Sequence, residues 1–157
     1  MINVIKEQKG NSLTVKMAGS IEESVNFEQI IGPSPGAGNE LQVNTKEVPR
    51  INSVGVKAWI KYFQMVSGSG AKLKFIECST AIVEQINLIL NFTCGGEVES
   101  IYVPFTCTAC KGELVGLFKT VDLKKMELQL PELKCTKCGG KATFDDIPEE
   151  YFAFLSR

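Results

Sequence analysis

The sequence predicts an α/β fold, in which a mixed sheet with helices is followed by a smaller β-rich region. Strand-like and helix-like runs alternate over about the first 100 residues, a pattern typical of a sheet covered by helices. The last third of the chain holds further strand-like runs and four of the six cysteines, arranged as two C-x-x-C pairs. With 157 residues, 44% of them hydrophobic and 22% charged, the chain has the composition of one globular domain or two small ones.

Five runs in the first part read as strands because they are rich in β-branched and other apolar residues and alternate in polarity. They are "INVIK", "LTVKM", "ELQVN", "KLKFIEC" and "EVESIYV".

Two longer segments have helical periodicity. After "VPRINS" the apolar positions recur at helical spacing, with Ser53 as the expected N-cap and "SGSG" at 67–70 as the stop. The expected buried positions are Val56, Trp59, Ile60, Phe63 and Val66. Ser79 is the expected cap of a second helix with Ile82, Val83, Ile86 and Leu90 on one face. A weaker helical stretch covers roughly residues 22–31.

The cysteine pairs are "CTAC" at 107–110 and "CTKC" at 135–138, with 24 residues between them. Each pair can form a tight turn that directs two thiolates to one centre, so Cys107, Cys110, Cys135 and Cys138 are expected to hold one structural Zn²⁺ per chain. The glycines of "CKG" and "CGG" are expected where the backbone turns back. Two strand-like runs between the pairs, "ELVGLF" and "MELQL", could form a hairpin.

Three other readings of these four cysteines stay open: disulfides, a thiol-redox site, and a metal other than zinc. Disulfides are disfavoured because the chain is expected to be cytosolic. Cys78 and Cys94 lie outside the pattern and are expected to be buried free thiols that pack as small apolar residues.

The boundary between the two parts is expected near "YVPFTC", which gives a domain at 1–101 and a Cys₄ zinc ribbon at 102–157. The final "IPEEYFAFL" is expected to be a short helix with Pro148 in its first turn, packed onto the ribbon through Tyr151, Phe152 and Leu155.

Composition argues against several classes of function. The chain has no histidine, which removes catalytic schemes built on imidazole. Its net charge is −1, and residues 102–157 carry 8 basic and 8 acidic side chains, so no basic footprint for nucleic acid is evident. No segment reads as a signal peptide or a membrane span, so a cytoplasmic location without membrane insertion is expected.

The order of elements and the stretch "INSVG" at 51–55 resemble a STAS domain, the family of sulphate transporters and anti-sigma-factor antagonists. The family has a core strand, a loop of the type Ile-Asp-Ser-Ser-Gly, an amphipathic helix, a strand after glycine, and a second helix. Here "GAKLKFIEC" at 70–78 corresponds to that strand and "AIVEQINLILNF" at 81–92 to the second helix. The resemblance covers roughly residues 1–101.

The resemblance implies a small non-enzymatic adaptor that docks a protein partner, such as a kinase-like anti-sigma factor, a sensor scaffold or a transporter ATPase. Members that act in sporulation and stress are phosphorylated on the second hydroxyl residue of the loop, a position that falls on Val54 here. The family's aspartates fall on Asn52 and Asn44. Without a hydroxyl at Val54 the switch is absent, and Ser53 is expected to cap the helix, with phosphorylation of Ser53 as the alternative.

The partner surface is expected at the start of this helix, around Ser53, Val54, Lys57 and Lys61, with the "GPSPGAG" loop at its rim. Lys57 and Lys61 are one turn apart and must share the solvent face if the apolar stripe is buried. A regulatory protein-binding module is therefore the preferred hypothesis. A nucleic-acid-binding zinc-ribbon protein and a thiol enzyme are the alternatives.

Overall fold

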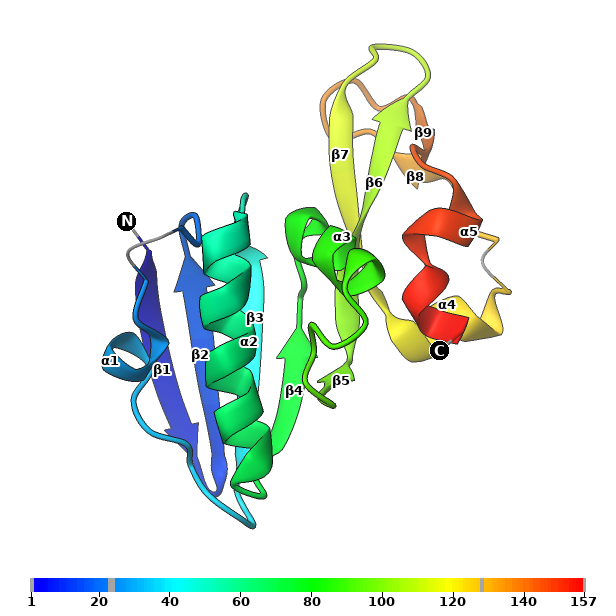
Figure 1. Ribbon diagram of the computed structural model, residues 1–157. Helices are drawn as coiled ribbons and strands as arrows, with labels where there is room; N and C mark the ends of the chain where they lie inside the picture. Colours follow the sequence, from blue (N-terminus) through cyan, green and yellow to red (C-terminus); the bar gives the residue numbers. More distant parts are fainter. Residues whose placement is uncertain (1, 23–24, 128, 157) are drawn as a thin grey trace.

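The computed structural model describes residues 2–22, 25–127 and 129–156 and shows an α/β protein with two sheets (Figure 1). The first sheet has the strand order β1-β2-β3-β4-β5, with β1 and β2 antiparallel and β2 to β5 parallel. Its strands are β1 (Asn3–Lys9), β2 (Ser12–Ala18), β3 (Glu40–Glu47), β4 (Lys72–Ile76) and β5 (Glu97–Val98).

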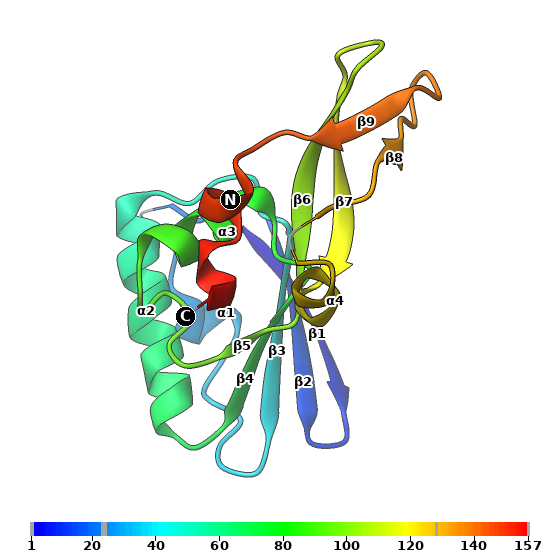
Figure 2. The same ribbon diagram turned by 90° about the vertical axis from the view of Figure 1, so that its right-hand side faces the viewer.

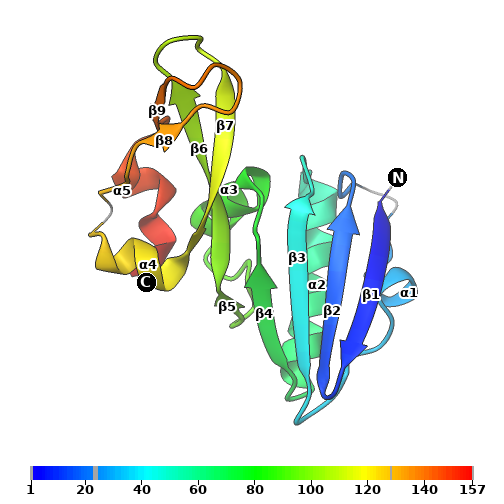
Figure 3. The ribbon, with the colours of Figure 1, turned by 180° about the vertical axis from the view of Figure 1, so that it is seen from behind.

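Three helices cover one face of the first sheet, as the side view in Figure 2 shows. They are α1 (Phe27–Ile30), α2 (Ser53–Gly68) and α3 (Thr80–Leu88). The view from behind in Figure 3 shows the opposite face without a helix over it. This face carries polar residues such as Thr14 and Gln42, whose side chains hydrogen-bond at 3.5 Å, so its contact with solvent costs little.

The core between α2 and the first sheet is aromatic. Trp59 is fully buried and stacks between Phe75 and Phe92, with ring centroids 5.5 and 4.8 Å away. Its indole N–H donates to the carbonyl of Phe92 at 2.9 Å, which satisfies the one polar atom of the side chain. The predicted buried positions Trp59 and Phe63 are confirmed, and Tyr62 joins them.

The second sheet is antiparallel and has the strand order β7-β6-β9-β8. Its strands are β6 (Ser100–Cys107), β7 (Glu113–Lys119), β8 (Leu133–Lys134) and β9 (Lys141–Phe144). The helix α4 (Thr120–Lys125) follows β7, and α5 (Pro148–Tyr151) and the 3₁₀ helix η1 (Ala153–Ser156) end the chain.

Two of the sequence predictions for this region are wrong. The run "EVESIYV" is divided at Glu99, because β5 joins the first sheet while β6 begins at Ser100 and belongs to the second. The run "MELQL" is not a strand in its described residues: α4 ends at Lys125 and a turn follows at 126–127, with residue 128 outside the described residues. The strand β7 therefore pairs with β6 rather than with a second strand of the spacer.

The helix expected at 22–31 is shorter than predicted. Asn26 caps it, its side chain accepting from Gln29 N–H, and it spans Phe27–Ile30. Residues 23–24 of the predicted helix lie outside the described residues. The Ser79 cap of α3 and the position of Pro148 at the start of α5 are confirmed.

The C-terminal segment returns from the second sheet onto α3. The Asn87 side chain donates to the Tyr151 carbonyl at 2.8 Å and accepts from the Phe154 N–H at 3.0 Å. The Tyr151 hydroxyl donates to the carbonyl of Tyr102 on β6 at 2.6 Å. Buried apolar residues of both sheets form a single cluster, which includes Ile101 and Phe152. The expected division at 101/102 therefore falls inside β6, next to a core that the two parts share.

Candidate metal centre

Strand pairing brings the two cysteine pairs together. Cys107 is the last residue of β6 and Cys135 directly follows β8, and β9 pairs with both strands. The turns at 107–112 and 135–140 therefore lie side by side at the same end of the second sheet (Figure 1).

The four sulfurs are close enough to hold one metal ion. All lie within 4.8 Å of one another; Cys107 Sγ is 3.5 Å from Cys138 Sγ, and Cys110 Sγ is 3.7 Å from Cys135 Sγ. A tetrahedral ion with sulfur ligands at about 2.3 Å requires sulfur–sulfur distances of about 3.8 Å. The predicted grouping of these four residues is confirmed, and none of the six cysteines forms a disulfide.

Backbone N–H groups point at each sulfur, which favours the thiolate form that a metal requires. The donors are Cys110 to Cys107, Gly112 to Cys110, Lys137 to Cys135, and Gly140 to Cys138, each at 3.4 Å.

Backbone hydrogen bonds and neighbouring sulfurs shift the pKa values of Cys107, Cys135 and Cys138 in different directions. The hydrogen bond from the Cys110 N–H is the main reason that the pKa of the Cys107 thiol is lowered to about 6. Hydrogen bonds from the backbone of Cys138 and Lys137 lower the pKa of Cys135. The Gly140 N–H acts in the same direction on Cys138, but the adjacent thiols of Cys107 and Cys110 outweigh it and raise the pKa of Cys138 to about 11. Four thiolates this close repel one another, and a cation at their centre removes that repulsion.

The two turns have the same shape but reach it with different residues. The left-handed position after the second cysteine is Lys111 in the first turn (φ 62°) and Gly139 in the second (φ 77°). The prediction that glycine makes both turns is therefore wrong at Lys111. The next residue in each turn, Gly112 or Gly140, is glycine because a side chain there would be crowded. A Cβ on Gly140 would lie 3.0 Å from Ala109 Cβ and 3.2 Å from Cys107 Sγ.

The sequence predicted a second functional surface at the start of α2, and the structure places its four residues on one exposed helix end. Ser53, Val54, Lys57 and Lys61 are all exposed, and 44% of Val54 is accessible. The expected role of Ser53 is wrong, because the N-cap is Asn52, whose side chain accepts from Gly55 N–H at 2.8 Å. Asparagine and serine are equally good caps, so sequence alone did not separate the two neighbours.

The start of α2 is held against Ile21, in the segment that follows β2. The Asn52 N–H donates to the Ile21 carbonyl at 3.2 Å, and the Ile21 N–H donates to the Arg50 carbonyl at 2.9 Å. A Cβ on Gly55 would lie only 2.3 Å from that Ile21 oxygen, so glycine is needed for the close approach. The loop is thus fixed while Val54 projects from it.

The two remaining cysteines are buried, as predicted. Burial raises the pKa of the Cys78 thiol to about 12 and also raises that of Cys94. Both thiols are therefore protonated and unreactive in the folded chain near neutral pH.

Sequence reasoning missed a polar group at the carboxyl ends of β3 and β4. Glu77 has a left-handed backbone (φ 46°) and accepts from Asn44 Nδ2 at 2.7 Å and from the Tyr102 hydroxyl at 3.3 Å. Its own N–H donates to Ser100 Oγ at 2.8 Å. No local sequence pattern indicates this group, because its members come from two strands, β3 and β6, and from the bend after β4.

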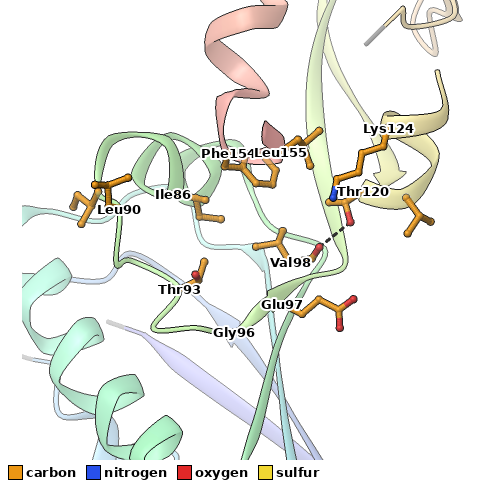
Figure 4. Close-up of a pocket in the computed structure, with 12 residues that line it drawn as sticks. Ile86, Leu90, Thr93, Gly96, Glu97, Val98, Thr120, Lys124, Phe154 and Leu155 are labelled. Atoms are coloured by element: carbon orange, nitrogen blue, oxygen red, sulfur yellow. Dashed lines mark hydrogen bonds between the residues drawn. The ribbon is translucent and has the colours of Figure 1, made fainter. Parts of the chain in front are cut away.

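A pocket of about 360 Å³ lies between α3, the segment before β5, α4 and the C-terminal turn (Figure 4). Its walls are mixed in polarity: Phe154 and Leu155 are apolar, while Lys124 and Glu97 are charged, and Thr120 Oγ1 donates a hydrogen bond of 2.8 Å to the Val98 carbonyl. No cysteine lines it, so it is separate from the metal centre.

A scan of the chain against models of protein families gave no match, and a search among curated proteins found no significant relative. None of the described helices is both long and apolar enough to cross a membrane.

Proposed function

We propose that the chain is a non-enzymatic, cytoplasmic protein-binding module of the STAS type, with a structural zinc ribbon at residues 102–157. The observation that carries the proposal is the exposed apolar side chain of Val54 at the fixed start of α2.

The metal is zinc in this proposal because four cysteine sulfurs within 4.8 Å of one another are a donor set that Zn²⁺ prefers. Four cysteines fill its coordination sphere and leave no position for a substrate or an activated water. The ion therefore acts in folding rather than in catalysis.

The STAS assignment is supported by the first sheet. Its elements β3, α2, β4 and α3 follow the order that the family resemblance implies: core strand, amphipathic helix, strand after glycine and second helix. The segment "INSVG" also opens α2, where the family has its regulatory loop.

Val54 supports constitutive rather than switched binding. A phosphate at this position would add about −1.5 to −2 charges and could repel or recruit a partner. Valine has no hydroxyl group that could be phosphorylated. An exposed apolar side chain at the start of the helix suits a persistent contact. The expected partners are those of the family: a kinase-like anti-sigma factor, a sensor scaffold or a transporter ATPase. Lys57 and Lys61 would favour an acidic patch on such a partner.

The test begins with capture of partners from the native cell, followed by calorimetry with the purified partner. Val54→Glu should weaken binding by about 1–3 kcal/mol, the cost of a charge at an apolar contact. Met65→Glu is the matched control, because Met65 is also apolar and exposed (37%) but lies near the far end of α2. Equal binding by Val54→Glu and the parent would place the contact elsewhere.

The stability of Val54→Glu shows whether Val54 is a surface residue or a core residue. The first turn of α2 has no acidic residue, so a glutamate at Val54 should be neutral or stabilising by about 0.3–1 kcal/mol. A much earlier thermal melt of Val54→Glu would mean that Val54 supports the fold rather than a partner.

One observation favours nucleic-acid binding as a second candidate. Although residues 102–157 are balanced in charge, four exposed lysines surround the metal centre, namely Lys111, Lys134, Lys137 and Lys141. Lys137 also reaches over the first cysteine turn, where its Nζ would lie 3.4 Å from a Cβ on Gly112. Binding to a mixed-sequence oligonucleotide that falls steeply with salt would support this candidate; absence of binding at low salt would remove it.

A further inference from the structure

The edge strand β7 is the longest apolar strand edge in the described part of the chain. The two sheets have four edges, β1, β5, β7 and β8, and of these β5 and β8 are only two residues long. The strand β1 is mostly polar and charged, which is a common protection against edge pairing. In contrast, β7 exposes 52% of Val115 and 49% of Leu117.

The hydrogen bonds beside β7 show which of its backbone groups face outward. Cys107 N–H donates to Gly112 O before the strand, and Thr120 N–H donates to Glu99 O after it, each at 2.9 Å. Because hydrogen-bonded pairs alternate in an antiparallel ladder, the even-numbered residues of β7 bond to β6. The odd-numbered residues therefore direct their N–H and C=O groups to the free edge; these are Glu113, Val115, Leu117 and Lys119.

We infer that two copies of the chain associate through β7, edge to edge and antiparallel, about a two-fold axis at Gly116. In this register Glu113 lies opposite Lys119 of the second copy, and Val115 lies opposite Leu117 of the second copy. The strand "ELVGLFK" is thus complementary to itself in both charge and hydrophobicity.

The register also satisfies the backbone. Its hydrogen-bonded pairs join odd-numbered residues only, which are the residues with free N–H and C=O groups. Shifting the register by two residues keeps that parity but places Glu113 opposite Leu117 or Lys119 opposite Val115, so the charge pairs are lost. The same operation on β1 about its central Lys6 places two lysines opposite each other, so β1 is not self-complementary.

The surroundings of β7 leave room for a second strand. In Figures 1 and 3 no strand of the described residues lies alongside β7 on the side away from β6, and the orange segment between β8 and β9 passes near its upper end. Val115 lines a hollow of about 340 Å³ together with Pro49 and Thr80, and Leu117 lines one of about 590 Å³ together with Ile76 and Glu77, so both hollows lie between β7 and the segments that follow β3 and β4. Leu133 packs at Gly116 on the inner face and does not obstruct the outer one. One strand pair buries less than a standard interface, so the association should be reversible.

Sedimentation equilibrium of the full-length, zinc-loaded chain at low salt tests the inference, from about 1 µM to about 1 mM. The parent should show a monomer–dimer equilibrium in that range. Glu113→Lys and Lys119→Glu should each weaken the dimer by about tenfold or more, because each change places like charges opposite each other at two symmetric sites. The double variant should restore the parent affinity.

Because Glu113 and Lys119 are at opposite ends of β7, only the dimer can couple them. Ile5→Lys, at the 69% exposed position on β1, is the matched control and should leave the equilibrium unchanged. A chain that stays monomeric throughout, or a dimer insensitive to the single charge reversals, overturns the inference. A dimer that is weakened by each reversal but not restored by the double variant overturns the register and the inference with it.

Discussion

Removing the metal from the full chain should open the metal-bearing end of the second sheet and leave the first sheet folded. A structural zinc ion supplies apparent free energies of about 10–16 kcal/mol in small sites. This is comparable to the total stability of an ordinary domain, about 5–15 kcal/mol. β8 and β9 are two and four residues long, so they cannot hold the cysteine turns together without the ion.

The aromatic residues provide separate probes of the two sheets. Trp59 is the single tryptophan and is fully buried between Phe75 and Phe92 of the first part. Phe144 of β9 stacks on Phe152 of the C-terminal segment, with centroids 5.3 Å apart. Chelation should therefore leave the tryptophan emission nearly unchanged while binding of an apolar dye increases, and added zinc should reverse the effect.

The shared core makes this a demanding test. α3 contacts β6, α5 and η1, so loss of the C-terminal segment removes one side of its packing. If the tryptophan emission shifts to that of the unfolded chain at the same chelator concentration, the two sheets unfold as one unit and the reasoning is refuted. If neither probe responds while the metal is shown to have left, the ion does not hold this region.

Three further predictions concern packing and ionisation. Gly140→Ala should lower metal affinity about 10–100-fold, because the added Cβ crowds the cysteine sulfurs. Gly139→Ala should mainly lower the stability of the fold, because alanine is strained in the left-handed backbone conformation of this residue. Competition with a chromogenic chelator measures the first effect and thermal melts measure the second. Asn87→Ala should destabilise the chain by about 1–3 kcal/mol, measured by urea unfolding, because two backbone groups of the C-terminal segment lose their partner. Burial raises the pKa of Cys78 and that of Tyr62 to about 12. As the pH rises, the unfolded chain therefore loses these protons before the folded chain does, and the free energy of unfolding should fall between about pH 9 and 12. A melting temperature that does not change with pH in that range would contradict this.

The grouping of the four cysteines could be predicted because its signal is local. Two C-x-x-C pairs each fix a turn, and the spacing between the pairs does not need to be known for the cysteines to converge. The strands β1 to β4 and the helices α2 and α3 were predictable for the same reason, since periodicity is read within a short window.

The parts that could not be predicted depend on contacts between distant residues. The division of "EVESIYV" at Glu99 follows from which sheet each half joins, and periodicity is the same for both. The return of the C-terminal segment onto α3 rests on Asn87, a residue that looks like any polar helix position. The group around Glu77 likewise forms only when β3, β4 and β6 come together.

The most direct test of the central claim is the metal content of the full chain purified without chelator. Elemental analysis should find about one zinc per chain in the parent, and Cys110→Ser should lose it, because three thiolates leave the coordination sphere incomplete. Cys94→Ser, which changes a cysteine outside the centre, should retain the metal. A parent chain without zinc, or full retention by Cys110→Ser, would contradict the account.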